Sequence, residues 1–142
     1  MEDCKPSLTP MEQKLKLSKF EGGELVNSTK YRQLVGSLIY LTNTRPNLSY
    51  SVSILSRFMQ EPRDSHWNST KRVLRYIQGT KYFGLLYKRN KIFALVGYSN
   101  SDFVVDIDDR TSTSGYLMNM GSTTVSCYCK KKTTISNSSV EV

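Results

Sequence analysis

The sequence predicts an α+β chain in which an extended arm precedes about three amphipathic helices and a short antiparallel meander. Between residues 30 and 80 the apolar residues recur with helical spacing, and beyond residue 80 the spacing shortens toward the alternation of a strand. The 142 residues, of which 38% are hydrophobic and 11% aromatic, are enough to fill one ordinary domain core. We therefore expect an extended arm over 1–29, a helical segment over 30–80 and a sheet over 81–142.

The arm is expected to have no regular secondary structure. Pro6, Pro10, Gly22 and Gly23 are spaced so that no periodic element can extend through it, and we expect it to order against a partner. It also has no apolar run of the kind that a secretory signal needs, which favours an intracellular protein. Nothing later in the sequence is long and apolar enough to span a bilayer.

Three helices are expected in the helical segment. The first ends at residues 43–46, and the second closes before Pro62, because the residue ahead of a proline is pushed out of the helical region. The third is capped by Asp64 or Ser65 and ended by Gly79 in the left-handed conformation. The apolar residues assigned to the three buried faces are Tyr31, Leu34, Val35, Leu38 and Ile39, then Leu48, Val52, Leu55 and Met59, then Trp67, Val73, Leu74 and Ile77.

Short strands are expected after Gly79, because the apolar residues there alternate with polar ones. Turn signals at 88–91 and 119–122 separate them. Consecutive strands with short links favour an antiparallel meander. The expected strands are Tyr82–Tyr87, Phe93–Tyr98, Thr113–Met118 and Thr123–Tyr128.

The net charge of +8 is concentrated in the middle of the chain. Residues 30–91 contain twelve Lys or Arg, opposed only by Glu61 and Asp64. Such an excess attracts a phosphate backbone or any acidic surface, and a solvated basic face is the alternative interpretation. The residues expected to contact phosphate or a partner are Lys71, Arg72, Arg75 and Lys81.

The remaining reactive side chains favour no metal and no cofactor. The three cysteines, Cys4, Cys127 and Cys129, leave one unpaired in any disulfide scheme, and the last two lack further zinc ligands at suitable spacing. The single histidine, His66, is expected at the surface or as a helix cap. The aspartates between residues 102 and 109 lack the glycine and terminal glutamate of a calcium loop, so a solvated acidic turn is expected.

Four segments, taken in order, resemble the polyprotein of copia-type retrotransposons. They are Tyr31–Pro46, Lys71–Thr80, Gly97–Phe103 and Asp108–Tyr116. In that family they run from the end of the reverse transcriptase into the start of the ribonuclease H domain. The resemblance therefore implies a truncated ribonuclease H sheet over residues 81–142. No residue matches the polymerase aspartates, which would lie upstream.

The same resemblance implies that the chain is not an enzyme. Ribonuclease H chemistry needs two divalent ions held by carboxylates. The family pattern over residues 97–102 places Asn100, a neutral and poorer ligand, at the first aspartate position, and Asp102 is the alternative on the same strand. Glu141 matches a non-ligand glutamate, and the chain stops before the ligand glutamate. We expect no cleavage of an RNA·DNA hybrid.

A second resemblance is to the secreted effectors of oomycete plant pathogens, whose Arg-x-Leu-Arg tetrapeptide matches Arg72, Val73, Leu74 and Arg75. The copia family has a similar helix for structural reasons, and the signal peptide and acidic stretch of the effectors are not visible.

The sequence therefore supports two functional hypotheses. One is a non-catalytic retroelement-derived protein whose basic helix contacts RNA, DNA or a partner. The alternative is an effector secreted into host plant cells, where it binds a host protein and suppresses defence or cell death. The basic run 130–132 makes the host nucleus one destination.

Overall fold

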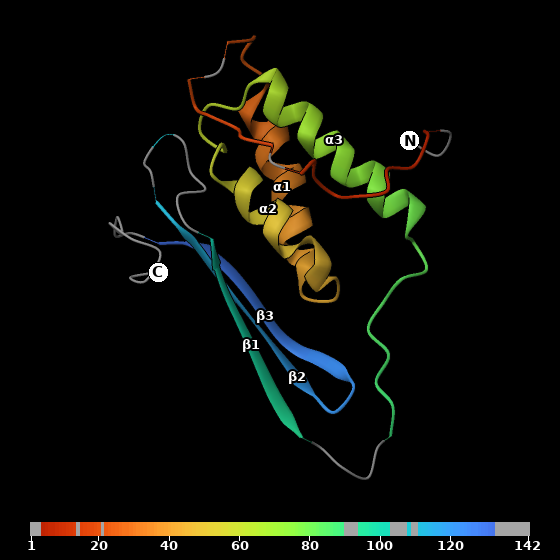
Figure 1. Cartoon of the computed structure of the whole chain (residues 1–142). Helices are drawn as coiled ribbons and strands as arrows, with labels where there is room; N and C mark the ends of the chain where they lie inside the picture. Colours follow the sequence, from red (N-terminus) through yellow and green to blue (C-terminus); the bar gives the residue numbers. More distant parts are fainter. Residues whose placement is uncertain are drawn as a thin grey trace.

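The chain has the predicted α+β class. The computed structural model describes residues 4–13, 15–20, 22–89, 94–102, 108 and 111–132. Within these ranges three α-helices precede an antiparallel sheet with strand order β1-β2-β3. Figure 1 shows the helices gathered on one side of the sheet, with the arm running along the last helix. The elements are α1 (Ser28–Thr42), the 3₁₀ turn η1 (Pro46–Leu48), α2 (Ser49–Ser56), α3 (Asp64–Gly79), β1 (Leu95–Asp102), β2 (Thr113–Met120) and β3 (Thr123–Lys131).

The arm and the helices build the hydrophobic core. Tyr31, Val35 and Leu38 lie along one face of α1 at the predicted helical spacing, and all three are buried. Leu17 from the arm closes the cluster, and each fully buried side chain of this size stabilises the fold by about 1.5–3 kcal/mol. The described part of the sheet adds no residue to this cluster, and the sheet meets the helices through the contact of α2 with β3. The cluster consists of Leu17, Tyr31, Val35, Leu38, Leu48, Val52, Ile54, Leu55, Phe58 and Val73.

Several residues assigned to the buried faces lie at the edge of this core. Trp67, Leu74 and Ile77 of α3 are partly buried against the cluster, whereas Val73 is fully buried. Ile39 of α1 is exposed, although its spacing placed it on the apolar stripe. No helix in the described part of the chain combines the length and apolar character that crossing a bilayer requires.

One predicted helix end is confirmed and another is wrong. α2 ends at Ser56, before Pro62 as predicted, although Met59 lies beyond its end. Gly79 is the last residue of α3 but is not left-handed, since positive φ among the described glycines is confined to Gly23 and Gly121. A Cβ added at Gly79 would lie 2.7 Å from the Cβ of Pro6, so glycine here permits the arm to approach the end of α3.

The later strands agree with the prediction at their starts. β2 begins at Thr113 and β3 at Thr123, and the turn between them contains Gly121 with a φ of 63°. The strand expected from Phe93 begins at Leu95 in the structure, and Phe93 lies outside the described residues.

The strand predicted over Tyr82–Tyr87 is wrong. No strand is assigned to this segment, which follows α3 and is mostly exposed. It touches β3 through side chains, since the hydroxyl of Tyr87 donates to the carbonyl of Thr124 at 3.3 Å and the hydroxyl of Thr123 donates to the carbonyl of Leu86. Alternating apolar residues make a strand only where a neighbouring backbone completes the hydrogen-bond ladder.

Replacement of Gly79 by alanine is expected to detach the first described residues of the arm. The new methyl group would clash with Pro6, so the Ser7 N–H would lose its 3.4 Å hydrogen bond to the carbonyl of Arg75. Backbone NMR shifts around Ser7 should move toward random-coil values. Gly36→Ala is the matched control, because Gly36 lies within α1 with nothing inside 4 Å, and alanine there should stabilise by about 0.5–1 kcal/mol. Unchanged Ser7 shifts in Gly79→Ala would contradict the packing.

The buried tyrosine of α1 predicts a loss of stability at alkaline pH. Tyr31 donates its hydroxyl to the carbonyl of Leu55 at 2.9 Å. Burial raises the pKa of Tyr31 to about 12 from an ordinary value of 10.0, because the phenolate would lose its hydration, while the Thr70 hydroxyl acts in the opposite direction. Since the folded pKa exceeds the unfolded one, the stabilisation is complete below pH 10.0 and is lost between pH 10.0 and about 12.

This loss is expected to be about 3 kcal/mol in the free energy of unfolding, measured by chemical denaturation from neutral to alkaline pH. Tyr31→Phe is the reference protein, because it should be about 1 kcal/mol less stable at neutral pH but should not lose stability through this group. Other tyrosines and lysines titrate in both proteins, so the difference between the two curves isolates Tyr31. Parallel curves would contradict the assignment.

Candidate functional site

The arm covers part of the basic face of α3 (Figure 1). Arg72 donates from Nη1 to Glu12 Oε1 at 2.7 Å and from Nη2 to the hydroxyl of Thr9 at 3.1 Å. The two charged side chains are 25% and 59% exposed, so their pairing contributes at most about 1 kcal/mol. The arm is therefore held on the basic helix by contacts that a competing anion can displace.

A cavity of about 300 Å³ lies between the arm and α3. Arg72 and Arg75 line it, and the Nε atom of each is buried without a hydrogen-bond partner among the described residues. The hydroxyl oxygen of Ser65, also at this cavity, is in the same condition. A buried donor without a partner costs about 1–3 kcal/mol, and a bound anion would remove that cost. The cavity is thus suited to a negatively charged group that takes the place of the Glu12 carboxylate, which also lines it.

The lysines expected to contact phosphate lie in solvent instead of under the arm. Lys71 is exposed, with Nζ 5.8 Å from the centre of the Trp67 ring. Lys81, just beyond α3, is also exposed and lies 5.1 Å from the centre of the Tyr82 ring. The structure therefore divides the four predicted basic residues into two accessible lysines and two arginines beside the arm cavity.

The middle residues of the Arg-x-Leu-Arg tetrapeptide belong to the core side of α3. Val73 is fully buried and Leu74 is partly buried against the cluster. The tetrapeptide therefore has a packing role in this fold, and only its two arginines are available for another contact.

His66 is not at the surface, and the helix-cap interpretation is the one that holds. Its ring is fully buried, and Nδ1 accepts the N–H of Arg63 at 3.0 Å. This leaves the proton on Nε2, which lies 3.1 Å from the carbonyl of Ser18 in the arm. The ring also stacks on Phe58 at 3.9 Å between centres. Sequence reasoning missed this site because Ser18 lies 48 residues before His66 in the chain.

Asp108 also fixes the arm, and it corrects the expectation of a purely solvated acidic turn. Its carboxylate accepts the hydroxyl of Ser18 and, at 2.8 Å, the N–H of Lys19. The neighbouring Asp106 and Asp109 lie outside the described residues. The sequence analysis did not predict the contacts of Glu12 or Asp108, because the partners of both lie far along the chain.

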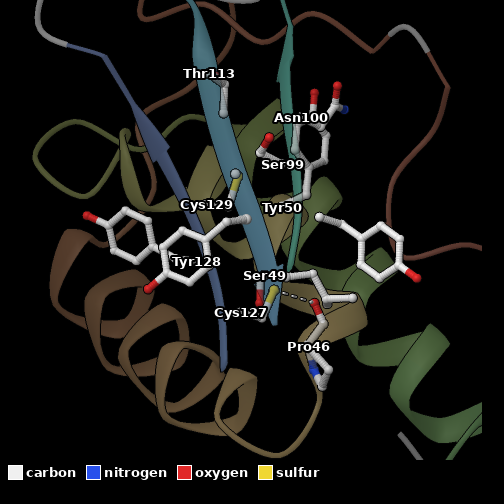
Figure 2. A pocket seen from close by; sticks show the side chains of 13 residues that line it. Pro46, Ser49, Tyr50, Ser99, Asn100, Thr113, Cys127, Tyr128 and Cys129 are labelled. Atoms are coloured by element: carbon white, nitrogen blue, oxygen red, sulfur yellow. Dashed lines mark hydrogen bonds between the residues drawn. The ribbon is translucent and has the colours of Figure 1, made fainter. Parts of the chain in front are cut away.

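The sheet presents Asn100 in β1, opposite Gly115 of β2. Asn100 is exposed and lines a cavity of about 260 Å³ between the sheet and the η1–α2 region (Figure 2). Asp102 pairs with Thr113 through the backbone, and the prediction about its carboxylate lies outside the described part of the chain. The prediction about Glu141 lies outside it too.

The two cysteines of β3 line the same cavity. Figure 2 shows the Cys127 thiol directed at the carbonyl of Pro46, 4.0 Å away, and Cys129 further along the strand. Both thiols are partly buried and neither forms a disulfide, and Cys4 is exposed. Among the described residues, no group of three or more His, Cys, Asp or Glu is placed to hold a metal ion.

Comparison with known proteins decides the family. The chain is 44% identical to the retrovirus-related Pol polyprotein from transposon RE2 of Arabidopsis thaliana, over 97% of this chain and 10% of that protein. It is 34% identical to the Pol polyprotein from transposon TNT 1-94 of Nicotiana tabacum, over 99% of this chain and 11% of that protein. The chain belongs to the copia-type retrotransposon Pol family.

This copia-type chain spans about a tenth of the length of those polyproteins. It is also 42% identical to the secreted RxLR effector protein 161 of Plasmopara viticola, over 82% of each chain. Both resemblances inferred from the sequence are thus confirmed at the level of similarity. No family model and no solved structure matches the chain.

Proposed function

We propose that this copia-type Pol chain is a non-catalytic module that contacts the sugar-phosphate backbone of RNA or DNA through the basic face of α3. The observation that supports this most is the pair of buried, unpartnered Nε donors of Arg72 and Arg75 beside the arm cavity. Lys71 and Lys81 add accessible positive charge on either side. Guanidinium donors and ammonium groups are the side chains that bind phosphate.

The arm makes this binding competitive. Glu12 occupies one side of the Arg72 guanidinium, where a phosphate oxygen would otherwise bind. A backbone phosphate must displace a partly exposed ion pair, which costs at most about 1 kcal/mol. The resulting contact would be independent of base sequence and would weaken as salt rises, because each neutralised phosphate releases counterions.

The non-catalytic part of the proposal rests on Asn100. A two-metal site places ions on both the attacking and leaving oxygens, and those ions need carboxylate ligands. An amide at the family's first aspartate position supplies no charge. Asn100 has the exposed position on β1 that such a ligand would need, so the change of residue type is what removes the chemistry.

A second function is favoured by the similarity to the secreted effector of Plasmopara viticola over most of both chains. In this proposal the chain acts inside host plant cells, binds a host protein and suppresses defence or cell death. The arm cavity and the two arginines beside it are the candidate contact surface, since Val73 and Leu74 are committed to the core. The two proposals share α3 and differ in the partner.

Backbone binding is tested by fluorescence anisotropy with a labelled RNA·DNA hybrid at several salt concentrations. Lys71→Ala/Lys81→Ala should lower the slope of log affinity against log salt by about 2, one unit for each lost phosphate contact. Glu12→Gln should raise affinity, because it frees Arg72 from its partner in the arm.

Lys16→Ala is the matched control, since Lys16 is an exposed lysine of the arm outside the basic segment. Affinity that does not depend on salt, or equal binding by the double variant and the control, would overturn the phosphate contact. Hydrolysis of the hybrid with Mg²⁺ or Mn²⁺ by the purified chain would overturn the non-catalytic part.

The effector proposal is tested by expressing the tagged chain in plant leaf cells challenged with a cell-death elicitor. Wild type should reduce necrosis, and Arg72→Ala/Arg75→Ala at the same protein level should not. Lys88→Ala/Arg89→Ala is the control, because these exposed residues lie outside the tetrapeptide and outside α3. Necrosis equal to that of an empty vector, with the protein present, would exclude this function.

A further inference from the structure

The face of the sheet that points away from the helices holds a pair of stacked tyrosines. Thr113 and Cys127 contact the helical side, the former through Arg57 at the C-cap of α2, so the alternate residues of β2 and β3 point to the other face. Tyr116 and Tyr128 are opposite each other in the register, with ring centres 5.6 Å apart and planes inclined by 22°. The two rings stack on each other across the two strands, so a further ring could extend the stack.

This aromatic surface is open. Tyr116 is 43% exposed and Tyr128 46%, although large aromatic side chains on a sheet are ordinarily covered by another layer. A hollow of about 500 Å³ adjoins the pair and is lined also by Ser99, Ser114 and Lys130. The hydroxyl oxygen of Ser114 is buried there without a hydrogen-bond partner in the described part of the chain.

Charge lies beside the rings. Lys130 is directly opposite Ser114 in the β2–β3 register, so its ammonium group and the unpartnered hydroxyl lie on the same face as the tyrosines. Lys130 is exposed, and the chain as a whole has a net charge of +8. A ligand that fits this face therefore presents a flat unpaired ring to the tyrosines. It also presents a negative group to Lys130 and Ser114, which lie two residues further along their strands.

We infer that the tyrosine face binds single-stranded RNA or DNA, with a base stacked on the Tyr116–Tyr128 pair and the adjoining phosphate held by Lys130 and Ser114. A single strand supplies both features, because its bases are unstacked and every base has a π-face. A duplex hides those faces, and an acidic peptide would use Lys130 but leave the rings uncovered. The site is on the sheet, so it goes beyond the backbone contact of α3 and does not depend on it.

The test measures binding of the full chain to a short fluorescein-labelled oligo(U) by anisotropy. Tyr116→Leu/Tyr128→Leu should weaken binding by at least about fivefold, because leucine keeps apolar volume but removes the stacking surface. Lys130→Ala should lower the salt slope by about 1. The matched control is Tyr40→Leu on α1, whose ring is 80% exposed and far from the sheet's aromatic pair in the sequence. Its affinity should equal that of wild type.

A conservative variant separates stacking from folding. Tyr116→Phe/Tyr128→Phe keeps both rings, so it should bind oligo(U) like wild type while the leucine variant does not. Equal affinity of the leucine variant, once its circular dichroism matches wild type, would overturn the inference. So would competition by poly-glutamate as effective as that by unlabelled oligo(U), which would assign the face to acidic chains. In a Lys71→Ala/Lys81→Ala background, which lacks the proposed phosphate contacts of α3, the leucine substitutions should still weaken oligo(U) binding by the same factor, so failure at α3 and failure at the sheet are distinguishable.

Discussion

One buried imidazole joins three segments on which the rest of the structure depends. His66 accepts a backbone N–H at the start of α3, stacks on Phe58 after α2, and meets the carbonyl of Ser18 in the arm. Each contact fixes a different element against the same ring. Without this residue the first turn of α3 would lose its cap, and the arm would lose an anchor in the middle of its path. The cavity beside Arg72 and Arg75 exists only because the arm is held there.

The sequence predicted those elements whose cause is local. The spacing of Tyr31, Val35 and Leu38 is sufficient for α1, and the Gly121 turn is sufficient for the β2–β3 hairpin. The features that it missed depend on partners far along the chain. Gly79 was assigned to a left-handed helix end, but its absent side chain makes room for Pro6. The segment 82–87 alternates like a strand, yet it makes no ladder with a neighbour.

The candidate sites follow the same division. Charge counting located the basic segment, because net charge is a property of composition alone. It could not show that Arg72 is engaged by Glu12 while Lys71 remains in solvent, since that distinction depends on where the arm lies. The sequence also did not predict the tyrosine pair of the sheet. Tyr116 and Tyr128 were each placed in a strand, but only the register brings the two rings together on one face.

The path of the arm also sets an order for synthesis. Glu12 contacts a residue 60 positions later, and Ser18 contacts one 90 positions later. At a translation rate of about 5–20 residues per second, those partners emerge between about 3 and 18 s after the arm. The arm leaves the ribosome before its partners in α3 and at Asp108, so its contacts form last and Leu17 stays in water until those partners have followed. During that interval the arm and its apolar Leu17 are exposed and can bind other molecules.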